Sequence, residues 1–465
     1  MNQPRINTSA YVIGDIAAAL FTWVLFYYLR SVFYDYPFSV PSGFYIGAFL
    51  YTTGWLSLHL LSGAYEGVYQ KTALTEILRT FFVSVTGCFG LLFFFILKNP
   101  HENNNNYYWE FFALLIPVFV TTLMMRLLFL RIIKSQLDNR KVFFNVLLIG
   151  AGKNATQFYE AFSRNNENSG FAISSFLNIN GGNGVMLPGE IKKYANLGNL
   201  NSIIESDNIE EVIITVEKTE RNTIAKILQQ LSDKDVNIKL TPDAVDIITG
   251  AVQTSNVMGV PLIDVHSGLL ASWQKNIKRL VDLVISIISL ILLLPLLIYT
   301  AIRTKLSSRG PVFYAQERVG YKGIPFTIYK FRSMVQDAEK NGPMLSTEDD
   351  PRITKWGRVM RKWRLDELPQ LWNIIKGEMS LVGPRPERKF YVDQILEDHP
   401  EYRYLFKVKP GLSSWGMVKF GYASSVNEMI QRMTYDLMYV ENISLVLDLR
   451  IMILTVMIIF KGKGK

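Results

Sequence analysis

Long uninterrupted runs of apolar residues dominate the first third of the chain. Four of them approach the ~20 residues that a membrane-spanning helix needs, and they cover about residues 10–33, 43–64, 77–97 and 108–130. The first run is too long for a cleavable signal peptide and is followed by further runs of the same kind. The pattern therefore predicts a four-helix transmembrane bundle over residues 1–140.

The positive charges of the short loops orient this bundle, because Lys and Arg resist translocation across a membrane. Five of them crowd the end of the fourth run, namely Arg126, Arg131, Lys134, Arg140 and Lys141. The opposite loops, around Asp35 and after Lys98, carry little positive charge. We therefore expect both ends of the bundle on the cytoplasmic side.

From Val142 onward the pattern changes to short β-branched strands that alternate with helical stretches. The expected strands are residues 142–149, 172–177, 211–216 and 236–240. Such alternation is typical of a doubly wound α/β domain, which we place at residues 141–260.

The first expected strand runs into a Gly-x-Gly-x-x-Ala turn at residues 150–155. A turn of this kind can aim a helix N-terminus at a diphosphate. A dinucleotide-binding domain also needs an acidic residue roughly 20 residues further on for the ribose, but the second strand ends at Asn178 and Asn180. The pattern therefore favours a Rossmann-like regulatory or packing module over an NAD site.

A fifth apolar run, residues 280–302, is interrupted by Pro295. Cations are as dense before it as after it, at Lys275, Lys278 and Arg279 on one side and Arg303, Lys305 and Arg309 on the other. The positive-inside rule disfavours a crossing with such flanks, and a proline inside a helix removes a hydrogen bond and kinks the helix. We therefore predict a re-entrant membrane helix at residues 276–303, preceded by a linker at 261–275. A fifth spanning helix is the alternative.

Residues 304–465 are too polar for lipid, so we expect a mainly α-helical domain at the cytoplasmic interface. Its last apolar run, Ile443 to Phe460, is interrupted by Asp448 and Arg450 and followed by three lysines, Lys461, Lys463 and Lys465. This pattern predicts an amphipathic helix that lies in the membrane interface. A helix of the soluble core is the alternative.

Charge is distributed unevenly along the chain. There are 49 Lys and Arg against 40 Asp and Glu, and residues 275–465 alone carry 30 of the basic and 19 of the acidic side chains. A basic half of this kind indicates an anionic partner, either a lipid surface or a phosphorylated substrate. The single cysteine, Cys88, excludes a disulfide framework and a cysteine-based zinc site.

Two adjacent carboxylates stand out in the polar part. Asp366 and Glu367 closely follow three cations, Arg361, Lys362 and Arg364. We expect these cations to keep Asp366 ionised and to attract phosphate oxygens. A carboxylate beside a divalent metal can attack phosphorus, and Glu367 would ligate or position Mg²⁺.

Further cations surround this pair in the sequence. Lys330 and Arg332 are two positions apart and share one face if the segment is extended. Arg385 stands between two prolines, which limit the entropy that its backbone loses when an anion binds, and Glu387 ends the same segment. With Arg361, these residues form the predicted substrate-binding set for a diphosphate.

From about Lys278 to the C-terminus the chain resembles the bacterial sugar transferases, the polyprenyl-phosphate glycosyl-1-phosphate transferases with a re-entrant membrane helix. The motifs that carry the resemblance occur in the family's order: Lys278-Arg279 with Asp282, Pro295, Gly310 to Phe313, Gln316 to Gly320, Lys330 to Met334, Asp350 to Arg352, Leu365 to Gln370 and Gly383 to Glu387. The preceding bundle and Rossmann-like module resemble the larger members, which initiate exopolysaccharide or O-antigen repeat units.

The resemblance implies a two-step exchange. Asp366 attacks the sugar-linked phosphate of a UDP-sugar, UMP leaves, and the phosphosugar passes to undecaprenyl phosphate. Glu367 organises the metal, with Asp366 and Glu367 as ligands of Mg²⁺ or, alternatively, Mn²⁺. The phosphate-contacting cations are Lys330, Arg361 and Arg385, and the residues of the re-entrant helix are Lys278, Arg279, Asp282 and Pro295.

The same resemblance implies a multi-pass protein of the bacterial inner membrane whose catalytic domain faces the cytoplasm. Membrane lipids and a second copy of the chain are the expected partners, and no nucleic acid is expected. The chain departs from the family at Leu294 and Arg364, where serine is common, and in the loop from Lys409 to Gly416.

Two other hypotheses remain. A non-catalytic membrane scaffold would recruit polysaccharide-assembly partners, although the intact Asp366-Glu367 pair argues against it. A nicotinamide-dependent sugar dehydratase would need a Tyr-x-x-x-Lys motif after the glycine-rich turn, and no convincing one is present.

Overall fold

The computed structural model describes residues 5–98, 105–150, 152–164, 170–179, 191–216, 221–231, 234, 236–242, 254–255, 262–264, 270–339, 342, 344–345 and 350–460. They belong to two compact units, one formed by Met1–Phe143 with Ala271–Ile277 and the other by Phe144–Leu270 with Lys278–Lys465. Some predicted features lie outside the described residues, namely Ala151 in the glycine-rich turn, Asn180, and the three C-terminal lysines.

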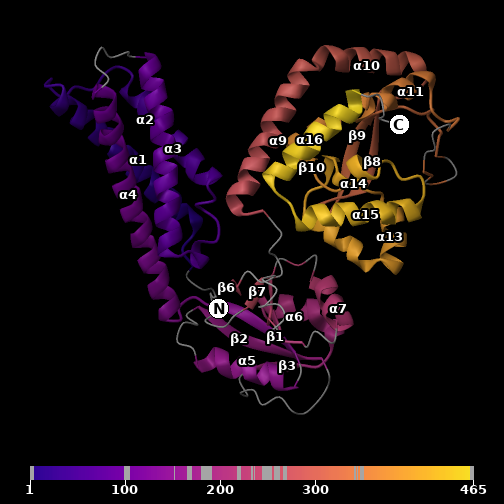
Figure 1. Cartoon of the computed structure of the whole chain (residues 1–465), viewed down its shortest axis with the longest axis horizontal. Coiled ribbons are helices and arrows are strands. Elements are labelled where there is room, and N and C mark those ends of the chain that lie inside the picture. The colour runs from indigo at the N-terminus through magenta and orange to yellow at the C-terminus, as the bar shows by residue number, and fades with distance from the viewer. Residues whose placement is uncertain are drawn as a thin grey trace. The chain divides into compact units, whose positions relative to one another are not determined.

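The four apolar runs of the N-terminal unit are helices (Figure 1), and they are α1 (Thr8–Phe33), α2 (Phe44–Leu61), α3 (Ala73–Lys98) and α4 (Asn105–Asp138). Within the described residues, α1, α3 and α4 are long and apolar enough to cross a membrane. Trp23, Tyr51 and Trp55 pack inside the bundle, while many apolar side chains point outward, as lipid requires. This unit therefore gives the chain the character of a membrane protein.

Arg126 of α4 lies fully buried inside this bundle. Its Nη2 contacts Oδ2 of Asp15 on α1 at 2.6 Å, and its Nη1 contacts Oε2 of Glu76 on α3 at 3.3 Å. The carbonyl of Ala64, after α2, accepts a further bond at 3.3 Å. Buried charges persist in an apolar bundle when they are paired in this way, and the pairing ties these elements to α4.

A sheet with the order β3-β2-β1-β4-β5-β7-β6 begins the second unit. Its strands are β1 (Phe144–Gly150), β2 (Phe171–Asn178), β3 (Lys192–Tyr194), β4 (Glu211–Ile214), β5 (Asn237–Leu240), β6 (Thr254–Ser255) and β7 (Leu262–Asp264). The first five in this order are parallel, and β7 and β6 add an antiparallel edge. This confirms a mixed α/β domain with a parallel sheet, and β7 lies inside the predicted linker at 261–275.

Helices cover both faces of this sheet because successive side chains of a strand point to opposite faces. Val146 and Leu148 of β1 pack with Phe158 of α5 (Gly152–Arg164). Leu147 and Ile149 pack with α6 (Leu200–Ser206) and α7 (Arg221–Leu231) on the other face. A short 3-10 turn, η2 (Leu197–Asn199), precedes α6, and another, η1 (Val68–Gln70), belongs to the N-terminal unit.

Gly150 ends β1 in very close contact with the neighbouring strand. A Cβ atom at this position would lie 2.0 Å from Oγ1 of Thr215, which itself donates to the carbonyl of Ile149 at 3.2 Å. The close approach of Thr215 is therefore sufficient to explain the glycine at this position. This favours the interpretation of the turn as a packing feature.

The segment predicted to dip into the membrane forms two helices, α9 (Ser272–Leu292) and α10 (Leu294–Ser307), bent by 64° at their break. Pro295 stands in the first turn of α10, where a missing N–H is tolerated. Apolar side chains on both sides of the bend are exposed, among them Leu292 and Leu294. Figure 1 shows the two helices along the edge of the region formed by β8 to α16, residues 313–460.

This C-terminal region, in which the sequence predicts the catalytic residues, consists of short elements packed against these helices. They are β8 (Phe313–Val319), η4 (Tyr321–Gly323), β9 (Pro325–Phe331), α11 (Lys355–Lys362), η5 (Leu365–Glu367), α12 (Gln370–Lys376), β10 (Ser380–Val382), α13 (Lys389–Asp398), η6 (Pro400–Lys407), β11 (Gly411–Ser413), α14 (Trp415–Lys419), α15 (Val426–Glu441) and α16 (Leu445–Phe460). β8 and β9 form an antiparallel hairpin, and β10 and β11 a parallel pair.

The C-terminal helix α16 has one buried face and one exposed face. Its Asp448 and Ile451 are buried against the catalytic region, and Asp448 pairs with Lys278 of α9 at 2.6 Å, so α16 lies alongside α9 (Figure 1). Val446 and Phe460 are each 78% exposed. One face therefore packs in the core, and another presents apolar side chains outward.

Candidate active site

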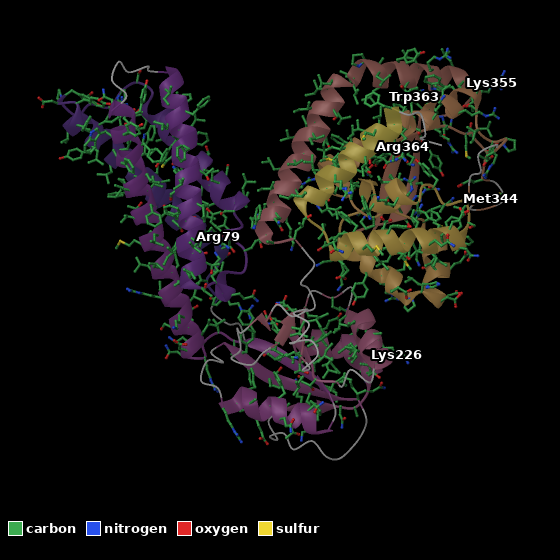
Figure 2. The ribbon with its side chains drawn as sticks, in the orientation of Figure 1. Arg79, Lys226, Met344, Lys355, Trp363 and Arg364 are labelled. Carbon is green, nitrogen blue, oxygen red and sulfur yellow. The ribbon has the colours of Figure 1, made fainter. Side chains whose placement is uncertain are left out.

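The two adjacent carboxylates lie on the short turn η5, directly after α11. Arg364 adopts the left-handed conformation, with φ of 54°, and this reverses the chain between α11 and η5. Figure 2 labels Trp363 and Arg364 at this point, with Trp363 near α10 and Arg364 deeper in the unit. Asp366 and Glu367 are buried, at 8% and 5% exposure, which is unusual for two acids in sequence.

These carboxylates line a cavity of about 270 Å³. All seven residues that the sequence predicted for catalysis or substrate binding line the same cavity. They come from β9 and the segment after it, from α11, from η5 and from the loop after β10. The fold thus gathers motifs that are up to 57 residues apart in the sequence, from Lys330 to Glu387.

Two cations hold Glu367 in place. Nζ of Lys330 lies 2.8 Å and Nη2 of Arg385 lies 3.2 Å from the same oxygen, Oε1 of Glu367. Burial by itself would raise the pKa of Glu367, but the charges of Lys330, Arg385 and Arg364 outweigh it and hold this pKa well below the usual range. Glu367 is therefore a permanently charged group.

Asp366 behaves in the opposite way. Burial, and then the neighbouring charge of Glu367, raise the pKa of Asp366, although Lys330 and Arg361 oppose the change. Arg361 lowers the pKa of Asp366, as the sequence led us to expect, but burial and the charge of Glu367 outweigh this effect. Asp366 is therefore the more basic of the two carboxylates.

Arg361 and Arg332 lie on another part of the cavity wall. Nε of Arg361 donates to Oγ of Ser333 at 3.0 Å, and Nη2 of Arg332 donates to the carbonyl of Ser308 at 2.7 Å. Arg332 is only 6% exposed, and its Nε and Nη1 have no hydrogen-bond partner among the described residues. The cavity thus contains cationic groups beyond those that neutralise Glu367.

Glu387 faces protein cations. Its Oε1 accepts from Arg432 at 2.6 Å and its Oε2 accepts from Arg318 at 3.3 Å, while Nε of Arg385 lies 4.0 Å from Oε1. This arrangement suits a residue that fixes the neighbouring arginines. Contact of Glu387 with a substrate remains a prediction.

Several cavity residues were not predicted as site residues. Arg318 belongs to a segment that the resemblance included, but its role depends on Glu387, far away in the sequence. Arg432 of α15 and Tyr422 before it also line the cavity. Asp436, one helical turn after Arg432, accepts from the backbone N–H of Gly416 at 2.8 Å, and burial raises its pKa to about 6. In the sequence, Asp436 is one of several polar residues of a helix, and nothing in the pattern indicates that it is buried.

The residues predicted for the re-entrant helix attach α9 to the catalytic region. Lys278 donates to the carbonyl of Val382 at 2.9 Å as well as to Asp448, and Asp282 accepts from the N–H of Leu381 at 3.0 Å. Arg279 donates to the carbonyls of Ile374 and Ile375, at 2.6 and 2.8 Å, where α12 ends. These residues hold α9 against β10, α12 and α16.

Asp366 and Glu367 are the carboxylates that suit a divalent cation in this cavity. Mg²⁺ typically binds one or two carboxylates together with substrate phosphates. Lys330 and Arg385 both donate to Oε1 of Glu367, and neither of these two bonds uses Oε2. The described residues contain no group of three or more His, Cys, Asp or Glu side chains that suits a metal. The residues present therefore fit Mg²⁺ bound together with a substrate.

Two family models match parts of the chain. The model of the bacterial sugar transferase family matches residues 273–462, which contain every cavity residue named above. A second model, described as a CoA-binding domain, matches residues 61–242.

Three relatives illustrate the similarity. Over 188 residues, the chain is 44% identical to a UDP-N-acetylgalactosamine-undecaprenyl-phosphate N-acetylgalactosaminephosphotransferase of Aeromonas hydrophila, covering 40% of this chain and 44% of that protein. Over 270 residues it is 33% identical to a UDP-glucose:undecaprenyl-phosphate glucose-1-phosphate transferase of Escherichia coli (strain K12), covering 57% of this chain and 58% of that protein. The chain thus spans about half the length of these two relatives.

The third relative is shorter and is matched over most of its length. It is an uncharacterised sugar transferase of Bacillus subtilis (strain 168), 38% identical over 188 residues, with 40% of this chain and 89% of that protein covered. The matched region carries the buried carboxylate pair and the cations around it. The chain belongs to the bacterial sugar transferase family.

Proposed function

We propose that this protein transfers a sugar-1-phosphate from a UDP-sugar to undecaprenyl phosphate at the cytoplasmic face of the bacterial inner membrane, as the first membrane step of a polysaccharide repeat unit. The observation that carries this proposal is the buried Asp366-Glu367 pair in a cation-lined cavity. The printed names of the relatives from Aeromonas hydrophila and Escherichia coli support the class of donor and acceptor.

The chemistry follows from the contrast between the two carboxylates. An oxygen of Asp366 attacks the phosphorus that carries the sugar, the bond from this phosphorus to the UMP oxygen breaks, and UMP leaves with the electron pair. A phosphate oxygen of undecaprenyl phosphate then attacks the same phosphorus, and the bond to Asp366 breaks. Phosphoryl transfer depends mainly on positioning and charge neutralisation, which Lys330, Arg361 and Arg385 are placed to supply.

Mg²⁺, held by Asp366 and Glu367 together with donor phosphates, would neutralise part of the charge that the leaving group develops. Glu367 keeps its negative charge throughout, because Lys330 and Arg385 hold its pKa low. The acceptor phosphate is already ionised near neutral pH, so the second step needs no strong base. The described residues of the cavity wall include no histidine, in agreement with this scheme.

The membrane arrangement belongs to the same proposal. Four spanning helices, α1 to α4, would hold the N-terminal unit, and α9 and α10 would enter and leave through the same leaflet, so that the cavity stays in the cytoplasm at the depth of lipid headgroups. The bend of 64° and the exposed apolar side chains beside it support a re-entrant segment. Membrane lipids would surround it, and two copies of the chain would pair.

Topology reporters test this arrangement. Tags inserted before Lys275 and beyond Arg309 are expected on the same, cytoplasmic side of living cells. Tags on opposite sides would make α9 and α10 a single span and would refute the re-entrant segment.

Release of UMP tests the activity. Purified protein mixed with Mg²⁺, undecaprenyl phosphate and a panel of UDP-hexoses and N-acetylated analogues is expected to release UMP with one of them. Asp366→Asn is expected to reduce the release to background, whereas Asp398→Asn, the same change at an exposed position on α13, leaves it unchanged. Full turnover in Asp366→Asn would refute the covalent step, and no UMP from any donor would favour the non-catalytic scaffold.

Omission of the acceptor tests the intermediate directly. With a sugar-labelled donor and no undecaprenyl phosphate, a covalent mechanism gives a burst of UMP of about one equivalent and a labelled protein. A direct transfer from donor to acceptor gives neither.

A further inference from the structure

Two guanidinium groups pack against the ring of Tyr422 at the wall of the cavity. Cζ of Arg385 and Cζ of Arg364 each lie 5.1 Å from the centroid of this ring. Cations at this distance from an aromatic centroid are attracted by the charge distribution of the ring. Tyr422 therefore connects an arginine of the catalytic turn to an arginine that contacts Glu367.

Arg364 is an unusual residue for its position. Its left-handed backbone, with φ of 54°, is unfavourable for a residue with a Cβ. Its side chain is 9% exposed, and its Nε has no hydrogen-bond partner among the described residues, although an unpaired buried donor destabilises a fold. Residues in such unfavourable states concentrate at functional sites.

The position of Arg364 excludes a direct role as a cavity-lining group. Tyr422, Arg385 and Glu367 are cavity-lining residues, and Arg364 is not among them. The guanidinium of Arg364 packs against the ring of Tyr422. Besides the effect of its charge on Glu367, the packing of Arg364 reaches the cavity wall through the ring of Tyr422.

Tyr422 can transmit this effect because it belongs to the segment between α14 and α15, next to Gly421, whose φ is 101°. Arg364 holds this segment against the catalytic turn. On the other side, Nη2 of Arg385 lies 3.2 Å from Oε1 of Glu367. The contacts thus run from Arg364 to the ring, from the ring to Arg385, and from Arg385 to the carboxylate pair.

We propose that Arg364 is a positioning residue for phosphoryl transfer, which packs against Tyr422 and through this ring fixes the guanidinium of Arg385 beside Glu367. This inference rests on the proposed function, since Arg385 is taken to contact the phosphoryl group. In this proposal the aromatic ring of Tyr422 orients the guanidinium of Arg385.

A double-mutant cycle tests the inference, with Arg364→Ser, Tyr422→Leu and the double variant compared for UMP release. A desolvated cation–aromatic contact corresponds to roughly three- to thirtyfold in rate. Arg364→Ser is expected to lower kcat by this factor with little change in KM for the UDP-sugar, because Arg385 acts as charge develops in the transition state. Since both residues act in one series, the double variant should be no slower than the slower single variant.

Conservative variants separate positioning from a general structural defect. Tyr422→Phe keeps the ring and Arg364→Lys keeps a cation, so each is expected to stay within about threefold of the unchanged protein. Arg358→Ser, which makes the same change at an exposed arginine of α11, is the matched control and is expected to leave kcat unchanged. The thermal unfolding temperature of every variant is measured alongside.

The outcomes divide clearly. Multiplicative losses in the double variant, a loss that Arg364→Lys does not restore, or a rise in KM with unchanged kcat would overturn the positioning role. Unchanged kcat in Arg364→Ser would overturn it as well. If the unchanged protein releases no UMP from any donor, the proposed function has failed; if it releases UMP and the cycle is multiplicative, only the role of Arg364 has failed.

Discussion

Replacement of Lys330 by methionine is the most direct test of the electrostatics of the cavity. Lys330 is the cation closest to Glu367, at 2.8 Å from Nζ to Oε1, and its charge also opposes the rise in the pKa of Asp366. Methionine has a similar length and no charge, so the variant fills the site but removes the cation. Arg385 still pairs with Glu367 at 3.2 Å, which retains a partner for the buried carboxylate.

The expected loss of activity in Lys330→Met is that for removal of one charge from the cavity. Removal of one preorganised charge or donor that stabilises a transition state reduces kcat by about 10²- to 10³-fold, or about 2.7 to 4 kcal/mol. A second, independent consequence concerns pH. Asp366 must be ionised to attack, and loss of the Lys330 charge raises its pKa further, so the acidic limb of the kcat/KM profile moves to higher pH.

Initial rates of UMP release over a range of pH give both quantities in one series. Lys389→Met serves as the control, because Lys389 is on the surface and its ion pair joins it to Asp393 of its own helix, with side chains 69% and 55% exposed. The control is expected to match the unchanged protein. A Lys330→Met variant that retains kcat/KM within threefold, with its acidic limb in the same place, would refute the electrostatic account of the cavity.

Two further predictions concern stability. Burial raises the pKa of Asp436 from 3.8 to about 6, so the stabilisation from its proton is present below about pH 4 and is lost as the pH rises through about 6, a change of about 3 kcal/mol. Asp436→Asn should therefore raise the unfolding temperature at pH 7.5 and not at pH 4, and an equal change at both would contradict this assignment. In the bundle, Arg126→Met removes the cation that pairs with the buried carboxylate of Asp15, which keeps a hydrogen bond from the hydroxyl of Tyr65. The variant should destabilise the protein by about 3 to 5 kcal/mol, whereas the exposed Arg131→Met should not; equal unfolding temperatures for the two variants would show that the buried ion pair contributes nothing.

Local patterns in the sequence were sufficient for much of the fold. The strands β1, β2, β4 and β5 are present where β-branched residues predicted them, because buried parallel strands are strongly apolar. β3, β6 and β7 have only two or three residues each, and such short strands depend on their neighbours in the sheet. The sequence of α16 likewise did not show which of its apolar residues would be buried, and in the structure Ile451 is buried while Val446 and Phe460 are exposed.

The candidate site shows a similar division. Asp366, Arg385 and Lys330 belong to compact motifs, so the sequence alone placed them in one site. The ring of Tyr422 and the contacts of Glu387 with Arg432 and Arg318 arise only when distant segments fold together. The direction of the shift in the pKa of Asp366 could not be predicted either, because it depends on the burial of the side chain and on the charge of Glu367 beside it.

That choice of contact explains why two neighbouring acids can perform different tasks. Lys330 and Arg385 both donate to Glu367, and their charges hold its pKa low; Asp366 shares the burial but receives less of the compensation, and its pKa rises. Groups whose environments drive their pKa values apart take separate roles in catalysis. Glu367 is thus suited to hold charge and ligands in place, and Asp366, the more basic oxygen, to form the bond to phosphorus. Any change that moves the cations from Glu367 to Asp366 would lower the basicity of Asp366 and slow the transfer, even with every catalytic group still present.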